Sequence, residues 1–229
     1  MNELRQVDLL RKIAGGFIHK IRNPLGIMSV STQFCIKYPK KKDKVKNHLE
    51  NIYRCINNIE KTLEYLDAFC RPLQLGMSRI AANKMLDGLF YLVQDKCKHQ
   101  EIKLTERYRH VSQELSADRD YLSEALLNII LNAIEAMPGG GVLTLEAGID
   151  NKLENVIIKF TDTGSGILER HKDGIFDPFF TTKEDRIGLG LCIAQRIINA
   201  HNGVIEVESA VGKGTTVTVC LPITKAPKE

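Results

Sequence analysis

The sequence is organised around one stretch near its start, Phe17-Ile18-His19-Lys20-Ile21-Arg22-Asn23-Pro24-Leu25. Apolar side chains recur at three- and four-residue steps through and around it, which predicts one buried stripe of an amphipathic helix. At about 100° per residue, His19 lies nearly opposite Phe17 and Ile21, so we predict that its imidazole faces water. The stripe consists of Leu10, Ile13, Ala14, Phe17, Ile21, Leu25 and Met28.

Two long helices are predicted at the start of the chain. The first covers about residues 4–38, with a kink at Pro24 because proline removes a helical hydrogen bond and clashes with the preceding turn. Residues 38–43 predict a turn, and a second amphipathic helix follows and ends near Arg71-Pro72. Two helices with such long apolar stripes cannot enclose a core alone. We therefore predict an antiparallel hairpin that dimerises into a four-helix bundle.

Beyond Pro72 the pattern changes to alternating strands and helices, joined in places by hairpins. This mixture predicts an α/β sandwich with its helices on one face. The whole chain is predicted as α+β, with the helical hairpin over residues 1–72 and the sandwich domain over residues 73–229. Strands are predicted over residues 73–77, 102–108, 142–149, 156–162, 203–209 and 215–221, and helices over residues 81–98, 118–137 and 189–201.

Composition narrows the class of protein. Of the 229 residues, 43% are apolar and 26% are charged, which is typical of a globular chain. The net charge of +4 is not gathered in one dominant basic tract, so we predict no nucleic-acid partner. No run approaches the roughly 20 apolar residues of a membrane span, and the start lacks a signal-peptide core. The six scattered cysteines favour reduced thiols and a cytoplasmic location.

The stretch from His19 to Leu25 resembles the phosphoacceptor box of two-component sensor histidine kinases, in which a helical histidine precedes a short polar run and Asn-Pro-Leu. The match fails at Lys20, where that family usually has glutamate or aspartate. The resemblance implies that His19 accepts a phosphoryl group. It also implies that Asn23, one helical turn further along the same face, positions water for dephosphorylating a partner aspartate.

Four boxes in the second half resemble the ATP-binding domain shared by histidine kinases, type II topoisomerases, mismatch-repair ATPases and the large heat-shock chaperones. Any one of them would be weak evidence, but together they follow the order and spacing of that family. They are Asn128-Ile129-Ile130-Leu131-Asn132-Ala133, Asp162-Thr163-Gly164-Ser165-Gly166-Ile167, Ile175-Phe176-Asp177-Pro178-Phe179-Phe180-Thr181-Thr182-Lys183 and Gly188-Leu189-Gly190-Leu191.

Asn128 and Asn132 lie four residues apart, so a helix places both carboxamides on one face. The resemblance implies that both contact the nucleotide and that Asn132 reaches Mg²⁺, for which an amide oxygen is a suitable ligand. Relatives that hydrolyse ATP carry a glutamate at the position of Asn128. An amide cannot act as a general base near neutral pH, so transfer to His19 is favoured over hydrolysis.

Asp162 follows a predicted strand, where its carboxylate can accept a hydrogen bond from the amino group of adenine. Gly164 and Gly166 allow the backbone to come close to the base. The turn Gly212-Lys213-Gly214-Thr215 resembles the family's glycine-threonine turn. For Thr215 two interpretations stay open, a hydroxyl on the phosphate side of the nucleotide and a plain hairpin turn.

Gly188, Leu189 and Gly190 open a predicted helix, and backbone N–H groups at a helix N-terminus bind phosphate. Thr182 and Lys183 are further candidates for phosphate contacts, Lys183 through its point charge. The aromatic residues of the box from Ile175 to Lys183 have two possible roles. They are expected either to pack the base of a mobile lid onto the domain or the helical hairpin, or to be ordinary residues of the core.

Two residues depart from the family pattern. Lys20 cannot accept a proton while charged, and a neighbouring cation lowers the proton affinity of His19. The resemblance therefore implies reduced but real kinase activity, unless Glu60 or Glu64 of the second helix takes the place of the missing acid. Arg186 stands where the family commonly has glycine. Its side chain is expected either to clamp a phosphate or to stiffen the lid.

The resemblance implies a homodimeric sensor histidine kinase core that binds ATP and Mg²⁺. It would transfer the γ-phosphoryl group to His19 and then to an aspartate of a response-regulator receiver domain, with or without phosphatase activity toward that regulator. The expected place is the cytoplasm, either free or as part of a longer membrane-tethered protein. Two alternatives stay open. One is a pseudokinase scaffold that docks a response regulator, and the other is an ATPase like the chaperone or mismatch-repair relatives.

Overall fold

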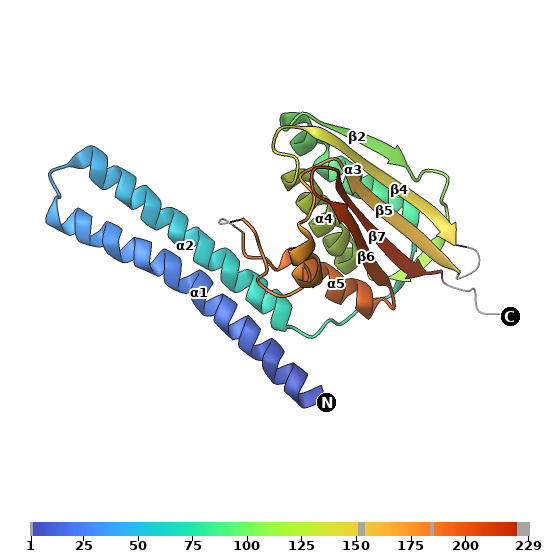
Figure 1. Ribbon diagram of the computed structural model, residues 1–229, viewed down its shortest axis with the longest axis horizontal. Coiled ribbons are helices and arrows are strands. Elements are labelled where there is room, and N and C mark those ends of the chain that lie inside the picture. Colours follow the sequence, from blue (N-terminus) through green and yellow to red (C-terminus); the bar gives the residue numbers. More distant parts are fainter. Residues whose placement is uncertain (1, 151–153, 184–185, 224–229) are drawn as a thin grey trace. The chain divides into compact units, whose positions relative to one another are not determined.

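The structure is a computed structural model that describes residues 2–150, 154–183 and 186–223. The chain forms two compact units (Figure 1). The first consists of Met1–Pro72 and Asp177–Leu189, and the second of Leu73–Phe176 and Gly190–Glu229. The predicted domain boundary between residues 72 and 73 stays a prediction.

The first unit contains the helical hairpin formed by α1 (Asn2–Lys37) and α2 (Lys42–Cys70). The α-helix of α1 runs through Pro24 without interruption. A short connection at residues 38–41 lets α2 return antiparallel to α1, as predicted (Figure 1). Ser31 of α1 is buried and hydrogen bonds to Nδ1 of His48 on α2 at 3.2 Å, which joins the two helices by a polar contact inside their interface.

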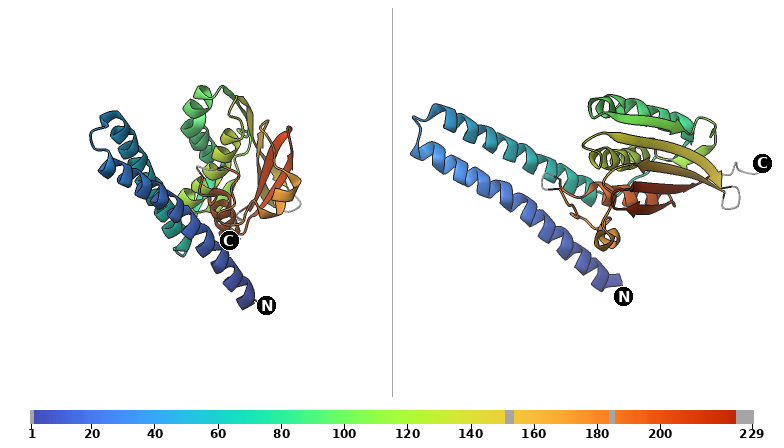
Figure 2. Two further views of the ribbon diagram at one scale, coloured as in Figure 1. Left: turned by 60° about the vertical axis from the view of Figure 1, so that its left-hand side comes forward. Right: turned by 45° about the horizontal axis from the view of Figure 1, so that its top comes forward.

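The second unit is built on one sheet of five strands in the described chain, in the order β2-β4-β5-β7-β6. Only the β2–β4 pair is parallel within it. Figures 1 and 2 show the helices of this unit together on one face of this sheet. The predicted α/β sandwich with helices on one face is therefore confirmed. The strands are β2 (Ile102–Arg107), β4 (Gly141–Asp150), β5 (Asn155–Asp162), β6 (Val204–Ala210) and β7 (Gly214–Pro222), and the helices are α3 (Ala82–His99), α4 (Arg119–Glu135) and α5 (Gly190–Ala200).

The core lies between this sheet and its helices because one side of each element is apolar. Buried side chains alternate along β4 and β5, which is the period of a strand with one covered face. In α4 they recur at helical spacing, so the helix presents one wide apolar face to the sheet. The buried residues of α4 are Leu122, Ala125, Leu126, Ile129, Ile130, Ala133 and Ile134.

The start of α4 is fixed by Asp118, whose side chain accepts hydrogen bonds from the N–H groups of Asp120 and Tyr121, both at 3.1 Å. The backbone N–H of Asp118 donates to Nε2 of buried His201 at 3.0 Å. Nδ1 of His201 lies 2.8 Å from the carbonyl of Ile197, so Nδ1 carries the proton. These bonds join the N-terminus of α4 to the C-terminal end of α5.

One predicted strand is wrong, and three short elements were not predicted. Residues 73–77 are irregular, and the N–H of Gly76 donates to the Asp118 carboxylate at 2.8 Å instead of entering a sheet. The first strand begins only after this segment. It is β1 (Ser78–Ala81), which pairs antiparallel with β3 (Glu114–Ala117). β3 was missed because four residues are too few to show a period. The 3₁₀ helix Glu169–Gly174 was missed as well.

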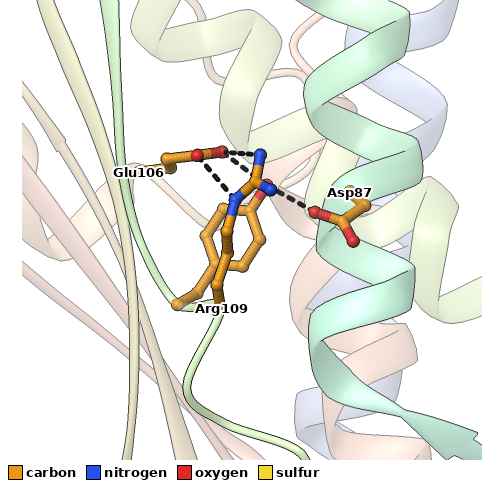
Figure 3. Close-up of polar contacts among 4 residues, drawn as sticks. Asp87, Glu106 and Arg109 are labelled. Atoms are coloured by element: carbon orange, nitrogen blue, oxygen red, sulfur yellow. Dashed lines mark hydrogen bonds and ion pairs between the residues drawn. The ribbon is translucent and has the colours of Figure 1, made fainter.

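Tyr108 closes the edge of the sandwich beside β2 and α3. Its ring is fully buried, and its hydroxyl lies 3.2 Å from Oδ1 of Asp87 and 3.4 Å from Oε2 of Glu106 (Figure 3). Arg109 donates to both oxygens of Glu106, at 2.6 and 3.1 Å. Burial and the two carboxylates raise the pKa of Tyr108, so its hydroxyl stays a neutral donor. The cluster ties the end of β2 to α3.

Candidate functional site

Asp162 ends β5 and is buried, with 4% of its surface exposed. Its Oδ1 accepts hydrogen bonds from the N–H of Gly164 at 2.8 Å and from the N–H of Thr215 at 3.2 Å. Burial raises the pKa of the Asp162 carboxyl, and these two bonds oppose the shift. Neither of these bonds uses Oδ2. A ligand with a hydrogen-bond donor can therefore bind this second oxygen.

The loop after Asp162 is docked closely against the C-terminal end of α4. A Cβ placed on Gly164 would lie 2.6 Å from the carbonyl oxygen of Ala136, so only glycine fits there. The next residue, Ser165, donates its N–H to the same carbonyl at 3.1 Å. Gly166 has a φ of +69° and lies against the backbone of Ala210. These glycines thus let the loop pack tightly against the end of α4 and against β6.

Thr215 is the cross-strand partner of Asp162 at the start of β7, and its side chain is buried. Its hydroxyl lies 2.9 Å from the hydroxyl of Ser209 on β6. Gly214 has a φ of +97°, and a Cβ there would fall 1.9 Å from the carbonyl oxygen of Asp162. The glycine therefore lets β7 begin directly beside the carboxylate.

Asn128 and Asn132 are half-buried on α4. Asn128 lies beside the first residue of α5, because a Cβ built on Gly190 would be 3.6 Å from its Oδ1. α4 and α5 pack against each other along this line. The asparagine pair and the N-terminus of α5 therefore belong to the same unit as Asp162 and Thr215.

In the first unit, His19 and Asn23 are exposed on α1, as the helical spacing predicts for His19. The ammonium group of Lys20 donates to the carbonyl of Arg186 at 2.5 Å. The ring of Phe179 lies against Gly16, where a Cβ would come within 2.5 Å of it. Phe179 and Arg186 thus both contact α1 within this unit.

The predicted binding residues divide between the two units. Thr182 and Lys183 are exposed, Gly188 has a φ of +80°, and Leu189 is buried. Their roles, and those of the residues around Asp162, stay predictions. The second unit holds Asn128, Asn132, Asp162, Gly164, Gly166, Gly190 and Thr215, and the first holds His19, Asn23, Thr182, Lys183, Gly188 and Leu189.

Ser209 was not predicted as a site residue. Its hydroxyl contacts Ile167, Gly214 and Thr215, which connects the loop after Asp162 with the turn before β7. A single serine near the end of a strand gives no sequence signal of its own. Only the pairing of β6 with β7 brings it to the site.

Comparison with known proteins identifies the class. Residues 117–225 match the family of histidine kinase-, DNA gyrase B- and HSP90-like ATPases. The sensor histidine kinase ZraS of Salmonella typhi is 32% identical over 225 residues, which are 97% of this chain and 48% of ZraS. The catalytic domain of histidine kinase ThkA superposes with a TM-score of 0.59 at 28% identity, over 65% of this chain and 99% of that domain.

A structure of ThkA in complex with the response regulator protein TrrA matches 96% of this chain and 64% of that chain, with a TM-score of 0.74 and 24% identity, and so shares the fold of the hairpin and the domain together. The second unit is thus an ATPase-type domain of the matched family. With the helical hairpin before it, the chain is a sensor histidine kinase catalytic core, as the sequence motifs implied. It spans about half the length of the curated relatives it matches. None of the described helices is both long and apolar enough to cross a membrane.

Proposed function

We propose that this chain transfers the γ-phosphoryl group of ATP to His19 and then to an aspartate of a response-regulator receiver domain. The observation that carries the proposal is an exposed histidine, within an HKIRNPL box on a hairpin helix, in the same chain as an ATPase-type domain. The complex formed by ThkA and TrrA supports a receiver domain as the partner. Alignment and charge stabilisation supply most of the catalysis in such a transfer.

The residues around Asp162 fit an adenine base. Oδ2 of Asp162, which neither of the two backbone N–H bonds uses, would accept from the amino group of the base. At the other end of the nucleotide, the backbone N–H groups at Gly188, Leu189 and Gly190 suit the phosphates, with Thr182 and Lys183 as further contacts.

Asn132 is the residue that would hold Mg²⁺. Asn132 is half-buried on the same face of α4 as Asn128, and Mg²⁺ commonly combines one or two protein oxygens with phosphate oxygens and water. The ion supplies positive charge for the phosphates when it is bound. Asn128 cannot act as a general base, so water is not activated at this position and transfer to His19 is favoured over hydrolysis.

The test is incubation of the purified chain with γ-labelled ATP and Mg²⁺, scoring protein label that is acid-labile and alkali-stable. We expect label on the parent, none on His19→Ala, and full label on His110→Ala, which removes an exposed histidine of the other unit. Label that survives in His19→Ala would refute the assignment of the phosphoacceptor. ATP binding without any label would favour the scaffold, and ATP consumption without label would favour the ATPase.

Lys20 is expected to limit the rate in the same assay. Lys20→Glu restores the acid that polarises the imidazole and also removes the bond to the Arg186 carbonyl. Lys20→Met removes that bond without adding an acid. Faster labelling in Lys20→Glu alone assigns the effect to the acid, and equal acceleration in both variants assigns it to loss of the bond to the Arg186 carbonyl. No acceleration in either would show that Lys20 is not limiting.

We also propose phosphatase activity toward the same regulator, because Asn23 is exposed one helical turn beyond His19. A carboxamide there can orient a water molecule toward a phosphorylated aspartate, and this step does not need an acid next to His19. Asn23→Ala is expected to slow dephosphorylation of a labelled regulator while His19 labelling persists. An unchanged dephosphorylation rate would remove this second activity.

The proposed assembly is a homodimer through the hairpin. α2 exposes Leu49, Tyr53, Ile56 and Leu63, whose steps of three, four and seven residues place them on one helix face. A second copy of the hairpin would cover this stripe and complete a four-helix bundle. The proposed location is the cytoplasm, which the chemistry supports because the five cysteines with described side chains are reduced and not joined in disulfides.

A further inference from the structure

Ser209 on β6 joins two parts of the Asp162 site through one hydroxyl group. The N–H of Ile167, in the loop after Asp162, donates to its Oγ at 2.9 Å. On the other side, Oγ lies 3.0 Å from the carbonyl oxygen of Gly214 and 2.9 Å from Oγ1 of Thr215. All of these residues belong to the second unit.

The direction of these bonds follows from counting hydrogens. A serine hydroxyl has one hydrogen to donate and two lone pairs that accept. The Ile167 N–H takes one lone pair, and the Gly214 carbonyl, which can only accept, takes the hydrogen. For every contact to be a hydrogen bond, Thr215 must donate its own hydroxyl hydrogen to the remaining lone pair of Ser209.

Thr215 is then left with acceptor capacity only. Its cross-strand partner Asp162 already uses Oδ1 for two N–H groups and offers Oδ2, again an acceptor. This wall of the site therefore calls for donors. The amino group of adenine is a donor of this kind. Hypoxanthine has a carbonyl oxygen in place of that amino group, so it presents a further acceptor to the acceptors of the wall.

We propose that Ser209 is a positioning residue that sets the base specificity of this site. By taking the hydroxyl hydrogen of Thr215, it keeps the wall around Asp162 an acceptor surface that favours adenine over bases with a carbonyl at the same place. The proposal rests on the proposed function in that it takes the site to bind a purine nucleotide.

The test is a measurement of the dissociation constants of ATP and of inosine triphosphate, by calorimetry with Mg²⁺, for the parent and for Ser209→Ala. Without Ser209 the Thr215 hydroxyl can turn and donate. The preference for ATP, expressed as the ratio of the two constants, is expected to fall about tenfold, the effect of one hydrogen bond of ordinary strength. A merely structural role would weaken both nucleotides equally and leave the ratio unchanged.

Matched variants make the result specific. Thr216→Val removes the neighbouring hydroxyl on the other face of β7, which pairs with Thr161 at 3.1 Å, and is expected to leave the ratio unchanged. Thr215→Val should lower the ratio, and adding Ser209→Ala to it should change the ratio no further, because Ser209 acts through Thr215. Ser209→Thr retains the hydroxyl and should keep a ratio near that of the parent.

An unchanged ratio in a folded Ser209→Ala protein that still binds ATP would overturn the role of Ser209 and leave the ATP site intact. If Ser209→Ala does not fold, Thr215→Val decides, and a ratio equal to that of the parent overturns the proposal. A folded parent that binds neither nucleotide would overturn the proposed function, and this inference with it.

Discussion

Asp162 combines a proposed role in binding with a cost in stability. Burial raises the pKa of its carboxyl, so the folded state holds the proton more tightly than the unfolded state does. The contribution of Asp162 to folding is therefore fully present below the ordinary aspartate pKa of about 3.9 and is lost as the pH rises through the raised value. At neutral pH the ionised carboxylate opposes folding.

Asp162→Asn is accordingly expected to raise the melting temperature at pH 7 while weakening ATP binding about ten- to hundredfold. The amide oxygen can still accept from Gly164 and Thr215, but the amide nitrogen then takes the place of Oδ2 and presents hydrogens to the amino group of adenine. Thermal melts from pH 4 to pH 8 and calorimetry with ATP check both halves. A lower melting temperature at pH 7 would contradict the effect of burial.

At the scale of the element, the turn between β6 and β7 separates two costs of replacing glycine. Gly212 and Gly214 both have positive φ, of +73° and +97°. A Cβ at Gly212 meets nothing within 4 Å, whereas one at Gly214 would fall 1.9 Å from the Asp162 carbonyl oxygen. Replacing Gly212 therefore has only the conformational cost of a positive φ. Replacing Gly214 adds a steric clash to that cost.

Gly212→Ala is expected to lower the free energy of unfolding by about 1 kcal/mol. Gly214→Ala is expected to lower it by at least about 3 kcal/mol and to abolish ATP binding, because the start of β7 must move away from Asp162. Urea denaturation followed by circular dichroism measures both variants, with Gly212→Ala as the matched control. Equal losses of unfolding free energy in the two proteins would show that the turn can shift to accommodate a Cβ at position 214 without further cost.

How well an element could be predicted depended on whether its signal was local. The helix predicted over residues 118–137 agrees with α4 because Asp118 caps it and its apolar residues keep one period. β3 is four residues long, and it pairs with β1, which lies far from it in sequence. No local sequence pattern indicates such a pairing. The candidate site divides in the same way. Asp162 and Gly164 stand together in one motif, whereas Ser209 reaches them only through the register of β6 and β7.

At the scale of the whole molecule, the exposed apolar stripe of α2 predicts a concentration-dependent assembly. Leu49 is 54% exposed on the hairpin, and Leu92 is 66% exposed on α3 in the other unit. A charge at position 49 would be buried in the proposed bundle, whereas a charge at position 92 stays in water.

Leu49→Glu is therefore expected to convert a dimer into a monomer in sedimentation velocity, and Leu92→Glu to leave the dimer intact. The melting temperature of the hairpin in the parent should rise with protein concentration, because association stabilises the folded state by mass action. A parent that sediments as a monomer at all concentrations would rule out the bundle. Dissociation by both variants would show that charge alone, wherever it is placed, disrupts assembly.

The strand order also has a consequence for how the domain is made in the cell. β7 follows all the other strands of the sheet in sequence, yet it lies inside the sheet, between β5 and β6, and carries Thr215 opposite Asp162. During synthesis, the edges of β5 and β6 that pair with β7 stay unpaired until β7 has been made. Unpaired strand edges are the places where unfinished chains aggregate. A chain that ends before Gly214 is therefore expected to be bound by chaperones or degraded by proteases, and not to fold into a shorter enzyme.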